Sequence, residues 1–226
     1  LSPWLQKMPG GLIHVNVVGC ALFAAISGSS AATVATVGKM SIPELRKRNY
    51  PEKILLGSLA GSGTLGLLIP PSIILIIYGV AVQESIAKLF IAGIIPGIMI
   101  ALIFMSYVVI WSLINKNEMP KILEEFSFLE KIKRSKQLLP VILLISAVIG
   151  SIYTGIATAT EAASLGVVGA LILSFFQKSL SLETFKSSLL GATKTSCMIA
   201  FILAGSTFLS LAMGFTGLPR NLALWI

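Results

Sequence analysis

The sequence is poor in the residues that build hydrolytic and metal-dependent active sites. Its 226 residues include one histidine, His14, and two cysteines, Cys20 and Cys197. A single histidine excludes a histidine-based metal cluster. The two cysteines lie in separate apolar segments, where we expect them to be small packing residues rather than a disulfide or a metal site.

Charged residues are also scarce, at 12% against 55% hydrophobic residues, and the mean hydropathy is +0.93. This composition excludes a soluble domain and predicts an all-α, polytopic helical membrane protein in a lipid bilayer. The apolar runs are too long for barrel strands and do not alternate with a period of two. The net charge of +8 comes from Lys and Arg between apolar runs, as in cytoplasmic loops, and does not indicate nucleic-acid binding.

Two polar, glycine-rich breaks interrupt this apolar sequence, at residues 27–30 and residues 62–72. In a bilayer every backbone N–H and C=O needs a partner, so irregular backbone persists only where it is buried in protein or lines a cavity. Two such breaks flanked by helices predict discontinuous helices that hold an ion or a small solute near the membrane midplane.

The first half of the chain divides into two segments around these breaks. Residues 1–43 are expected to form a re-entrant hairpin with its tip at residues 27–30, because the apolar run 11–26 reaches only about 24 Å into a core of about 30 Å. Residues 44–86 are expected to form one broken transmembrane helix. Its first half should end near Gly61, and its second half should start at Pro70 and Pro71.

The rest of the chain is expected to add a helix, a surface arm and three further crossings. Residues 87–115 should cross the membrane with a kink at Pro96, and residues 116–137 should form an amphipathic helix on the cytoplasmic surface or a linker helix. Residues 138–226 should begin a second repeat with crossings at 138–153, 162–176 and 195–213. We expect the chain to be a fragment, because Leu1 and Ile226 look like cuts in a longer protein.

Glu161 has two interpretations. The sequence from Thr158 to Glu161 fits a helix capping box, which predicts that Glu161 caps the following helix. A buried catalytic or proton-carrying glutamate is the alternative.

The breaks carry oxygen and N–H groups that suit a cation and an anion. Pro70 and Pro71 have no N–H, so the carbonyls of Gly66 and Leu67 should be free to ligate a small cation such as Na⁺ together with hydroxyls of the hairpin tip. The helices that start at the breaks present N–H groups and a positive dipole end to a carboxylate. Because both breaks lie in long uncharged stretches, dipoles and the cation must neutralise a charged solute.

Four motifs in order resemble the large membrane subunit of tripartite ATP-independent periplasmic (TRAP) transporters, most closely the C4-dicarboxylate type. They are residues 23–38, 63–73, 89–97 and 153–163, and the resemblance covers nearly the whole chain. It implies a Na⁺-driven importer of organic acid anions in the cytoplasmic (inner) membrane of a bacterium or archaeon. The family uses an elevator-type, inverted-repeat fold of the ion-transporter superfamily, with a small four-helix membrane subunit and a periplasmic solute-binding protein as partners.

The resemblance also implies the site residues. The Na⁺ ligands would come from Ser27, Ser29, Gly66, Ile69 and Pro71. The substrate anion is expected at the helix starts, at Ser30, Ala31 and Ser72, on the separate ground that these starts present free N–H groups. Two departures stand out: Ala159 replaces a proline that is usual in the family, and a second, inverted copy of the hairpin and broken helix is absent. A second Na⁺ site would lie in that copy.

One alternative stays open: a stand-alone anion exchanger or channel of the same fold, which would differ in its dependence on Na⁺ and on partners. An intramembrane serine hydrolase is disfavoured, because no His or Asp is placed to activate the serines of the tip. His14 lies about three and a half helical turns away. We therefore expect a transporter and not an enzyme.

Overall fold

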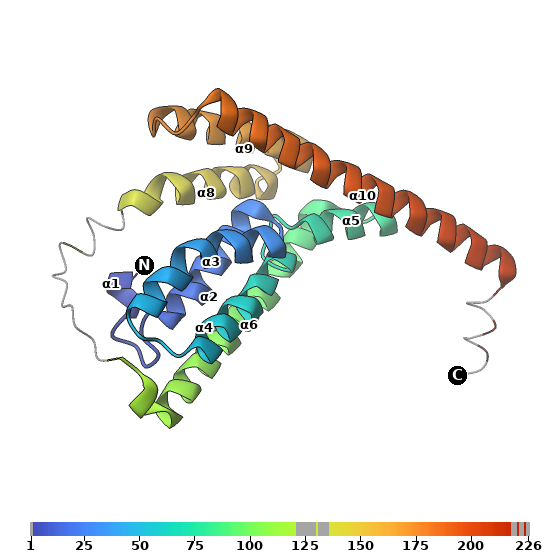
Figure 1. Ribbon diagram of the computed structural model, residues 1–226. Coiled ribbons are helices and arrows are strands. Elements are labelled where there is room, and N and C mark those ends of the chain that lie inside the picture. The colour runs from blue at the N-terminus through green and yellow to red at the C-terminus, as the bar shows by residue number, and fades with distance from the viewer. Residues whose placement is uncertain (1, 121–129, 131–135, 218–220, 222–223, 225–226) are drawn as a thin grey trace. The chain divides into compact units, whose positions relative to one another are not determined.

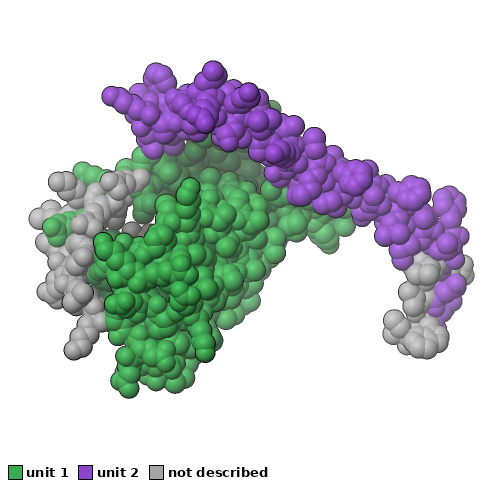
Figure 2. All heavy atoms as spheres, viewed as in Figure 1, with its two compact units in different colours: residues 1–170 green, residues 171–226 purple. Residues whose placement is uncertain are grey.

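The computed structural model describes residues 2–120, 130, 136–217, 221 and 224, which form helices and turns with no strand among them. The chain, drawn in Figure 1, divides into two compact units, residues 1–170 and residues 171–226 (Figure 2). Within the described residues, three helices are long and apolar enough to cross a membrane: α6 (Ile86–Ile114), α9 (Ala159–Phe176) and α10 (Leu182–Thr216). An all-α, multi-pass membrane protein is thereby confirmed.

The first unit begins with a short helix, α1 (Ser2–Leu5), and continues with an antiparallel pair, α2 (Ile13–Ser27) and α3 (Ser30–Lys47). Leu12, before the start of α2, packs against Leu45 near the end of α3. Halfway along, Cys20 packs against Val37. The pair is a helical hairpin with its turn at the predicted break.

The second helix of this hairpin is longer than predicted. It continues through Pro43 to Lys47, whereas the sequence placed the end of the hairpin at residue 43. Leu45 is 2% exposed and packs against Leu55, so the additional turn is held by the core although a proline precedes it.

The predicted broken helix is also present, as α4 (Glu52–Gly63), the 3₁₀ turn η1 (Thr64–Leu67) and α5 (Ile73–Val82). The second half begins at Ile73, so Pro70 and Pro71 precede the helix instead of occupying its first turn as predicted. Ser72 explains the difference, because its extended backbone (φ −119°, ψ 132°) makes it the N-cap of α5.

Polar side chains hold α2 to α4 along a buried seam. The Asn16 side-chain amide donates to the Leu55 carbonyl oxygen at 3.2 Å and to Ser58 Oγ at 3.1 Å. Ser62 Oγ donates to the Ser58 carbonyl oxygen at 2.6 Å and to that of Asn16 at 3.5 Å. We call Asn16, Ser58 and Ser62 the α2–α4 seam. The hydrogen bonds offset part of the cost of burying these groups, while Asn16 Oδ1 is buried without a partner among the described residues.

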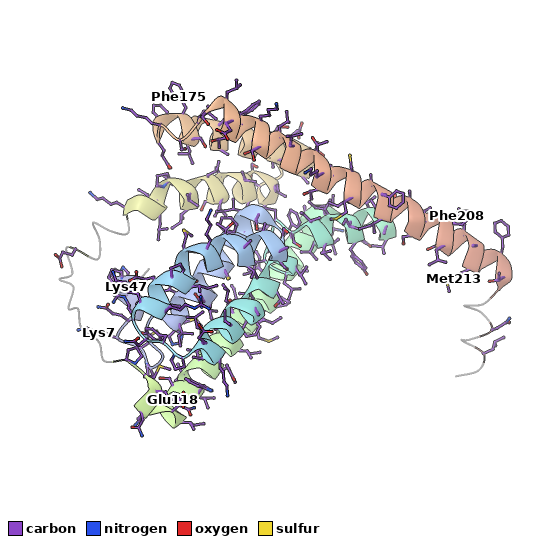
Figure 3. All side chains as sticks on the ribbon, in the orientation of Figure 1. Lys7, Lys47, Glu118, Phe175, Phe208 and Met213 are labelled. Atoms are coloured by element: carbon purple, nitrogen blue, oxygen red, sulfur yellow. The ribbon has the colours of Figure 1, made fainter. Side chains whose placement is uncertain are left out.

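The two ends of the first unit differ in charge. At one end, Ile13, Ile54 and Val108 pack together, which places the starts of α2 and α4 beside the end of α6. Figure 3 shows Lys7, Lys47 and Glu118 at this end; Glu118 closes the 3₁₀ turn η2 (Lys116–Glu118). There Tyr50 OH accepts a hydrogen bond from the Leu12 N–H at 3.0 Å, and burial raises the pKa of this phenol.

An apolar cluster lies at the opposite end. Phe90 near the start of α6 packs with Ile152, near the end of α8 (Leu139–Tyr153), and with Ala162, near the start of α9. This cluster brings the loop at residues 83–85 close to the turn at residues 154–160.

Three predictions for the later segments have different outcomes. The capping box is confirmed: Glu161 Oε2 accepts from the Thr158 N–H at 2.8 Å, and the Glu161 N–H donates to Thr158 Oγ1 at 3.3 Å. The expected amphipathic arm, 116–137, lies largely outside the described residues, which resume at η3 (Lys136–Leu138). The third prediction, a membrane crossing at residues 138–153, falls on α8. The 15 residues of this helix span about 22 Å, less than the membrane core of about 30 Å.

The second unit is dominated by α10, a helix of 35 residues. It begins at Leu182, where the Ser181 hydroxyl accepts from the Thr184 N–H at 3.1 Å. The predicted crossing at 195–213 is therefore the later part of a longer helix. Large apolar side chains such as Phe201 (81% exposed) and Phe208 (75% exposed) point outward, as expected for contact with lipid or other helices.

Candidate functional site

The two predicted breaks touch each other. The Ile73 N–H, at the start of α5, donates to the carbonyl oxygen of Gly28 at the hairpin tip, at 3.3 Å. A Cβ added to Gly28 would lie 2.8 Å from the Pro71 carbonyl oxygen, and one added to Gly66 would lie 3.0 Å from Ser29 C and Ser30 N. Both glycines thus allow backbone to approach backbone, as close packing of a hairpin tip against a helix break requires.

The turn itself has a local origin. Gly28 is the C-cap of α2 with φ +57°, a left-handed conformation that favours glycine, and its N–H donates to the Ala24 carbonyl oxygen at 2.9 Å. Ser29 is extended and caps α3 by accepting from the Ala32 N–H at 3.5 Å. The end of one helix and the start of the next therefore meet at the tip.

A cluster of hydroxyl groups fills the inside of the tip. Ser27 Oγ lies 2.9 Å from Thr33 Oγ1, and Thr33 Oγ1 donates to the Ser29 carbonyl oxygen at 2.8 Å. Ser27 Oγ also donates to that carbonyl at 3.3 Å. Thr33 is fully buried and was missed by the sequence reasoning. Its spacing of four residues from Ser29, which places both on one face of a helix start, was the signal that could have found it.

The carbonyls of Gly66 and Leu67, which lose their helical donors to Pro70 and Pro71, differ in whether another group donates to them. The Ser72 hydroxyl donates to the Leu67 carbonyl oxygen at 2.8 Å, so this oxygen is not left free as the sequence suggested. The Ile69 N–H donates to the Leu65 carbonyl oxygen at 2.9 Å, and no N–H of the described residues donates to the Gly66 carbonyl oxygen. Of the two carbonyls, that of Gly66 is thus the available one.

The structure brings some of the predicted site residues together. Ser27, Ser29, Gly66 and Pro71 lie at the contact between the breaks, whereas the Ile69 side chain packs into a core cluster with Leu65. For the predicted substrate residues the picture is mixed. Ser30 Oγ is buried without a hydrogen-bond partner, Ala31 is exposed at the start of α3, and Ser72 uses its hydroxyl proton on Leu67.

The electrostatics of this contact come from backbone alone. No ionisable side chain occurs in either break, and no group of three or more His, Cys, Asp or Glu within the described part of the chain could hold a metal ion. A cation here would be held by hydroxyl and carbonyl oxygens, which are ligands for hard cations. The ends of α2 and η1 add partial negative charge, while the starts of α3 and α5 add partial positive charge.

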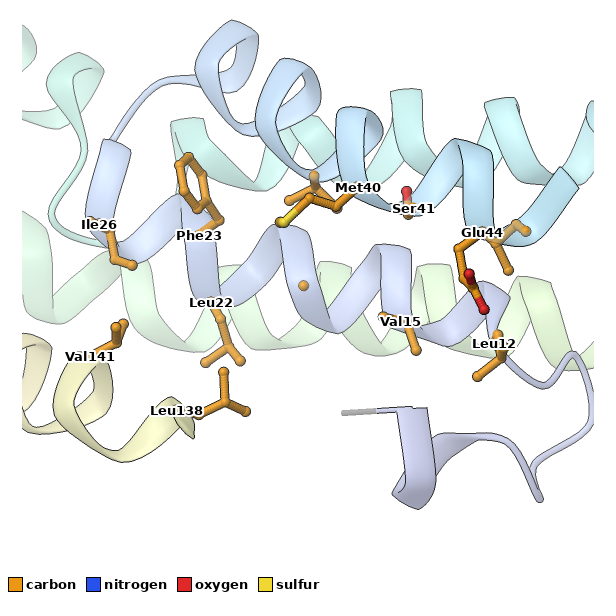
Figure 4. A pocket seen from close by; sticks show the side chains of 13 residues that line it. Leu12, Val15, Leu22, Phe23, Ile26, Met40, Ser41, Glu44, Leu138 and Val141 are labelled. Atoms are coloured by element: carbon orange, nitrogen blue, oxygen red, sulfur yellow. The ribbon is translucent and has the colours of Figure 1, made fainter. Parts of the chain in front are cut away.

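A cavity of about 470 Å³ lies elsewhere, along the side of the hairpin. It runs from Ile26 near the tip to Glu44 near the charged end, and Leu138 and Val141 line it too (Figure 4). Its walls are apolar apart from Ser41 and Glu44. Because convergent polar groups are lacking, the cavity does not suit a small hydrophilic ion, and the contact between the breaks remains the better candidate.

Comparison with known proteins gives a consistent result. Residues 5–226 match the family described as "Tripartite ATP-independent periplasmic transporter, DctM component". The C4-dicarboxylate TRAP transporter large permease protein DctM of Pseudomonas aeruginosa is 36% identical over 219 residues, which cover 96% of this chain and 50% of the relative.

Two further relatives have other substrates in their names. The ectoine/5-hydroxyectoine TRAP transporter large permease protein UehC of Ruegeria pomeroyi is 36% identical, over 97% of this chain and 51% of the relative. The sialic acid TRAP transporter large permease protein SiaM of Vibrio cholerae is 35% identical, over 95% of this chain and 50% of the relative. The chain spans about half the length of these relatives, which are transport proteins and not enzymes.

Proposed function

The chain belongs to the DctM component family of tripartite ATP-independent periplasmic transporters, and we propose that it forms part of a Na⁺-coupled importer of organic acid anions. The observation that carries this proposal is the hydrogen bond from the Ile73 N–H to the Gly28 carbonyl oxygen, which joins the two breaks. Two interrupted helical elements in contact are the arrangement in which secondary transporters bind ions and solutes.

The coupling ion would bind among the oxygens of this contact. Hydroxyl oxygens are available from Ser27 and Ser29, and backbone carbonyls from Gly66, Ile69 and Pro71. These ligands carry no formal charge, which favours a monovalent cation, since a divalent cation is normally matched by carboxylates. Burial of the unpartnered Ser30 hydroxyl beside Gly66 supports a bound polar species at this place.

The anion would bind at the two helix starts. The N-terminal turns of α3, at Ser30 and Ala31, and of α5, at Ser72, have backbone N–H groups without intrahelical partners. With no arginine or lysine in either break, the carboxylate charge would be balanced by these dipoles and by the Na⁺. This would make anion binding depend on Na⁺ and would provide the physical basis of symport.

We propose a C4-dicarboxylate-like acid as the substrate class. Relatives at 35–36% identity have dicarboxylate, sialic acid and ectoine in their names, so similarity to them does not select a substrate. A dicarboxylate suits a site with two positive helix ends. Delivery by a periplasmic solute-binding protein would contribute to selectivity.

The proposed assembly sits in the cytoplasmic (inner) membrane of a bacterium or archaeon. The hairpin α2–α3 would enter the membrane from the cytoplasmic side and turn back, which suits the gathering of charged residues at its open end. Together with the broken helix it would form the moving part of an elevator. A small four-helix membrane subunit would brace the scaffold.

Uptake into proteoliposomes tests the proposal. The full-length protein is reconstituted with its small membrane subunit, and radiolabelled succinate uptake is measured with and without a Na⁺ gradient and the binding protein. Uptake that requires both is expected. Uptake that is independent of both would instead identify a stand-alone exchanger or channel.

A double variant tests the ligand assignment. Ser27→Ala with Ser29→Ala should raise the Na⁺ concentration needed for half-maximal uptake. Ser85→Ala is the matched control, because Ser85 also caps a helix, by accepting from the Lys88 N–H at 3.5 Å, but lies outside the site. An unchanged Na⁺ requirement in the double variant would refute the assignment of these two serines.

A further inference from the structure

Two glycines of α6, Gly93 and Gly97, pack against the break between α4 and α5. A Cβ added to Gly93 would lie 2.7 Å from the Leu68 carbonyl oxygen, and one added to Gly97 would lie 2.9 Å from Ile69 Cγ1. The two glycines are one helical turn apart and therefore share a face. Together they form a notch on α6, which we call the α6 notch, that accommodates the irregular residues 68–69.

Further along α6 the large residue lies on α6 and the glycine on the neighbouring helix. A Cβ added to Gly61, on α4, would lie 3.1 Å from Phe104 Cε1, on α6. Ile69 joins Leu65 in a cluster that includes Phe104. A bulky residue of α6 thus fits over a glycine of α4, while glycines of α6 receive the break. This size complementarity fixes α6 in register along both parts of the broken helix.

The contact at Gly93 is made by backbone and has little freedom to adjust. Leu68 lies between Gly66 and Pro71, both proposed Na⁺ ligands, and a carbonyl oxygen cannot rotate aside as a side chain can. At 2.7 Å an added methyl group would have to displace it. Binding sites require their ligands to be held within about 0.5 Å of the productive geometry, so a displacement of a few tenths of an ångström matters.

We propose that Gly93 and Gly97 are positioning residues for the ion site. The α6 notch holds the Leu68–Ile69 backbone in the position that aims the oxygens of the break at the hairpin tip. The role is indirect, because neither glycine contacts the tip. The proposal rests on the proposed Na⁺ coupling.

The decisive variant is Gly93→Ala in the full-length transporter, and Gly57→Ala is its control. Gly57 is also a helical glycine, on α4, but a Cβ there meets nothing within 4 Å. Loss of a partner that orients metal ligands typically weakens affinity by about 10–100-fold. We therefore expect Gly93→Ala to raise the Na⁺ concentration for half-maximal succinate uptake about ten-fold, with Gly57→Ala unchanged.

Amide hydrogen exchange gives a readout that does not require Na⁺ coupling. In Gly93→Ala the amides of residues 67–69 should exchange faster, while those of the α2–α4 seam stay protected. Na⁺-dependent wild-type uptake with an unshifted Na⁺ requirement in Gly93→Ala would overturn the proposal. Na⁺-independent wild-type uptake would overturn the proposed function instead, and unchanged exchange at residues 67–69 would overturn the role of the notch by itself.

If Gly93→Ala does not fold, Gly97→Ala provides the test. Its added methyl group meets a side-chain atom, Ile69 Cγ1, which has more freedom to move than a carbonyl. We expect Gly97→Ala to raise the Na⁺ requirement by less than ten-fold. In the double variant Gly97→Ala with Ile69→Ala the clash is removed, so a Na⁺ requirement close to that of Ile69→Ala alone would support a steric notch. Strictly additive effects of the two substitutions would contradict it.

Discussion

The Ile73 N–H and the Gly28 carbonyl oxygen, distant in sequence, are joined by a hydrogen bond of 3.3 Å. The first residue of α5 is thereby fixed to the turn between α2 and α3. A second contact supports it, because the Pro71 carbonyl oxygen would lie 2.8 Å from a Cβ at Gly28. The hairpin tip and the helix break are thus held at the distance of direct backbone contact.

Gly28→Ala should separate the two breaks. An L-residue in the left-handed region costs about 1–2 kcal/mol, and here the new methyl group would also push Pro71 away. Gly155→Ala is the matched control, since Gly155 has φ +73° but open space around its Cα. We expect both variants to lose thermal stability, and only Gly28→Ala to lose Na⁺-dependent uptake. Equal uptake in the two variants would contradict a functional contact.

Thr33→Val should weaken Na⁺ binding without a change of side-chain shape. The substitution removes the hydroxyl that donates to the Ser29 carbonyl oxygen at 2.8 Å and contacts Ser27. We expect the Na⁺ concentration for half-maximal uptake to rise by about ten-fold, as for other groups that orient metal ligands. Thr36→Val, on the same helix, should have no effect. A normal Na⁺ requirement in Thr33→Val would limit this residue to packing.

Asn16→Leu should loosen the hairpin from α4. The variant removes the two hydrogen bonds that the Asn16 amide donates to the Leu55 carbonyl and to the Ser58 hydroxyl, each worth about 0.5–1.5 kcal/mol. The temperature of unfolding in detergent should therefore fall. Asn115→Ala is the control, because the Asn115 side-chain amide donates to the Trp111 carbonyl oxygen, one turn earlier in its own helix end, and does not join two helices. A fall no larger than that of the control would show that the seam adds little stability.

Glu161→Gln distinguishes the two interpretations of this residue. A glutamine keeps one side-chain oxygen to accept from the Thr158 N–H, so the capping function is retained while the charge and the titrating proton are lost. We expect the rate of uptake and its dependence on pH to remain unchanged. Glu161→Ala, which also removes the cap, should lower thermal stability without altering the pH dependence. Loss of uptake in Glu161→Gln would favour a proton-carrying role.

The sequence located the breaks well because helix breaking is local. The double proline and the runs of glycine and hydroxyl residues disfavour a helix locally, so residues 27–30 and 62–72 could be identified without neighbours. Single prolines were not sufficient, because Pro43 and Pro96 lie inside α3 and α6. The boundaries were less accurate. Leu45 extends α3 beyond residue 43 through core packing, and Ser72 delays the start of α5 to Ile73.

By itself the sequence determined the class of protein and the places where its helices stop, since both follow from composition and from the backbone chemistry of single residues. The tertiary structure decided which freed groups remain available. Ser72 takes the Leu67 carbonyl, Thr33 joins the tip, and the α6 notch receives Leu68 and Ile69. Such assignments depend on contacts between segments far apart in the chain, and whether an oxygen is free depends on which donor the fold brings within reach.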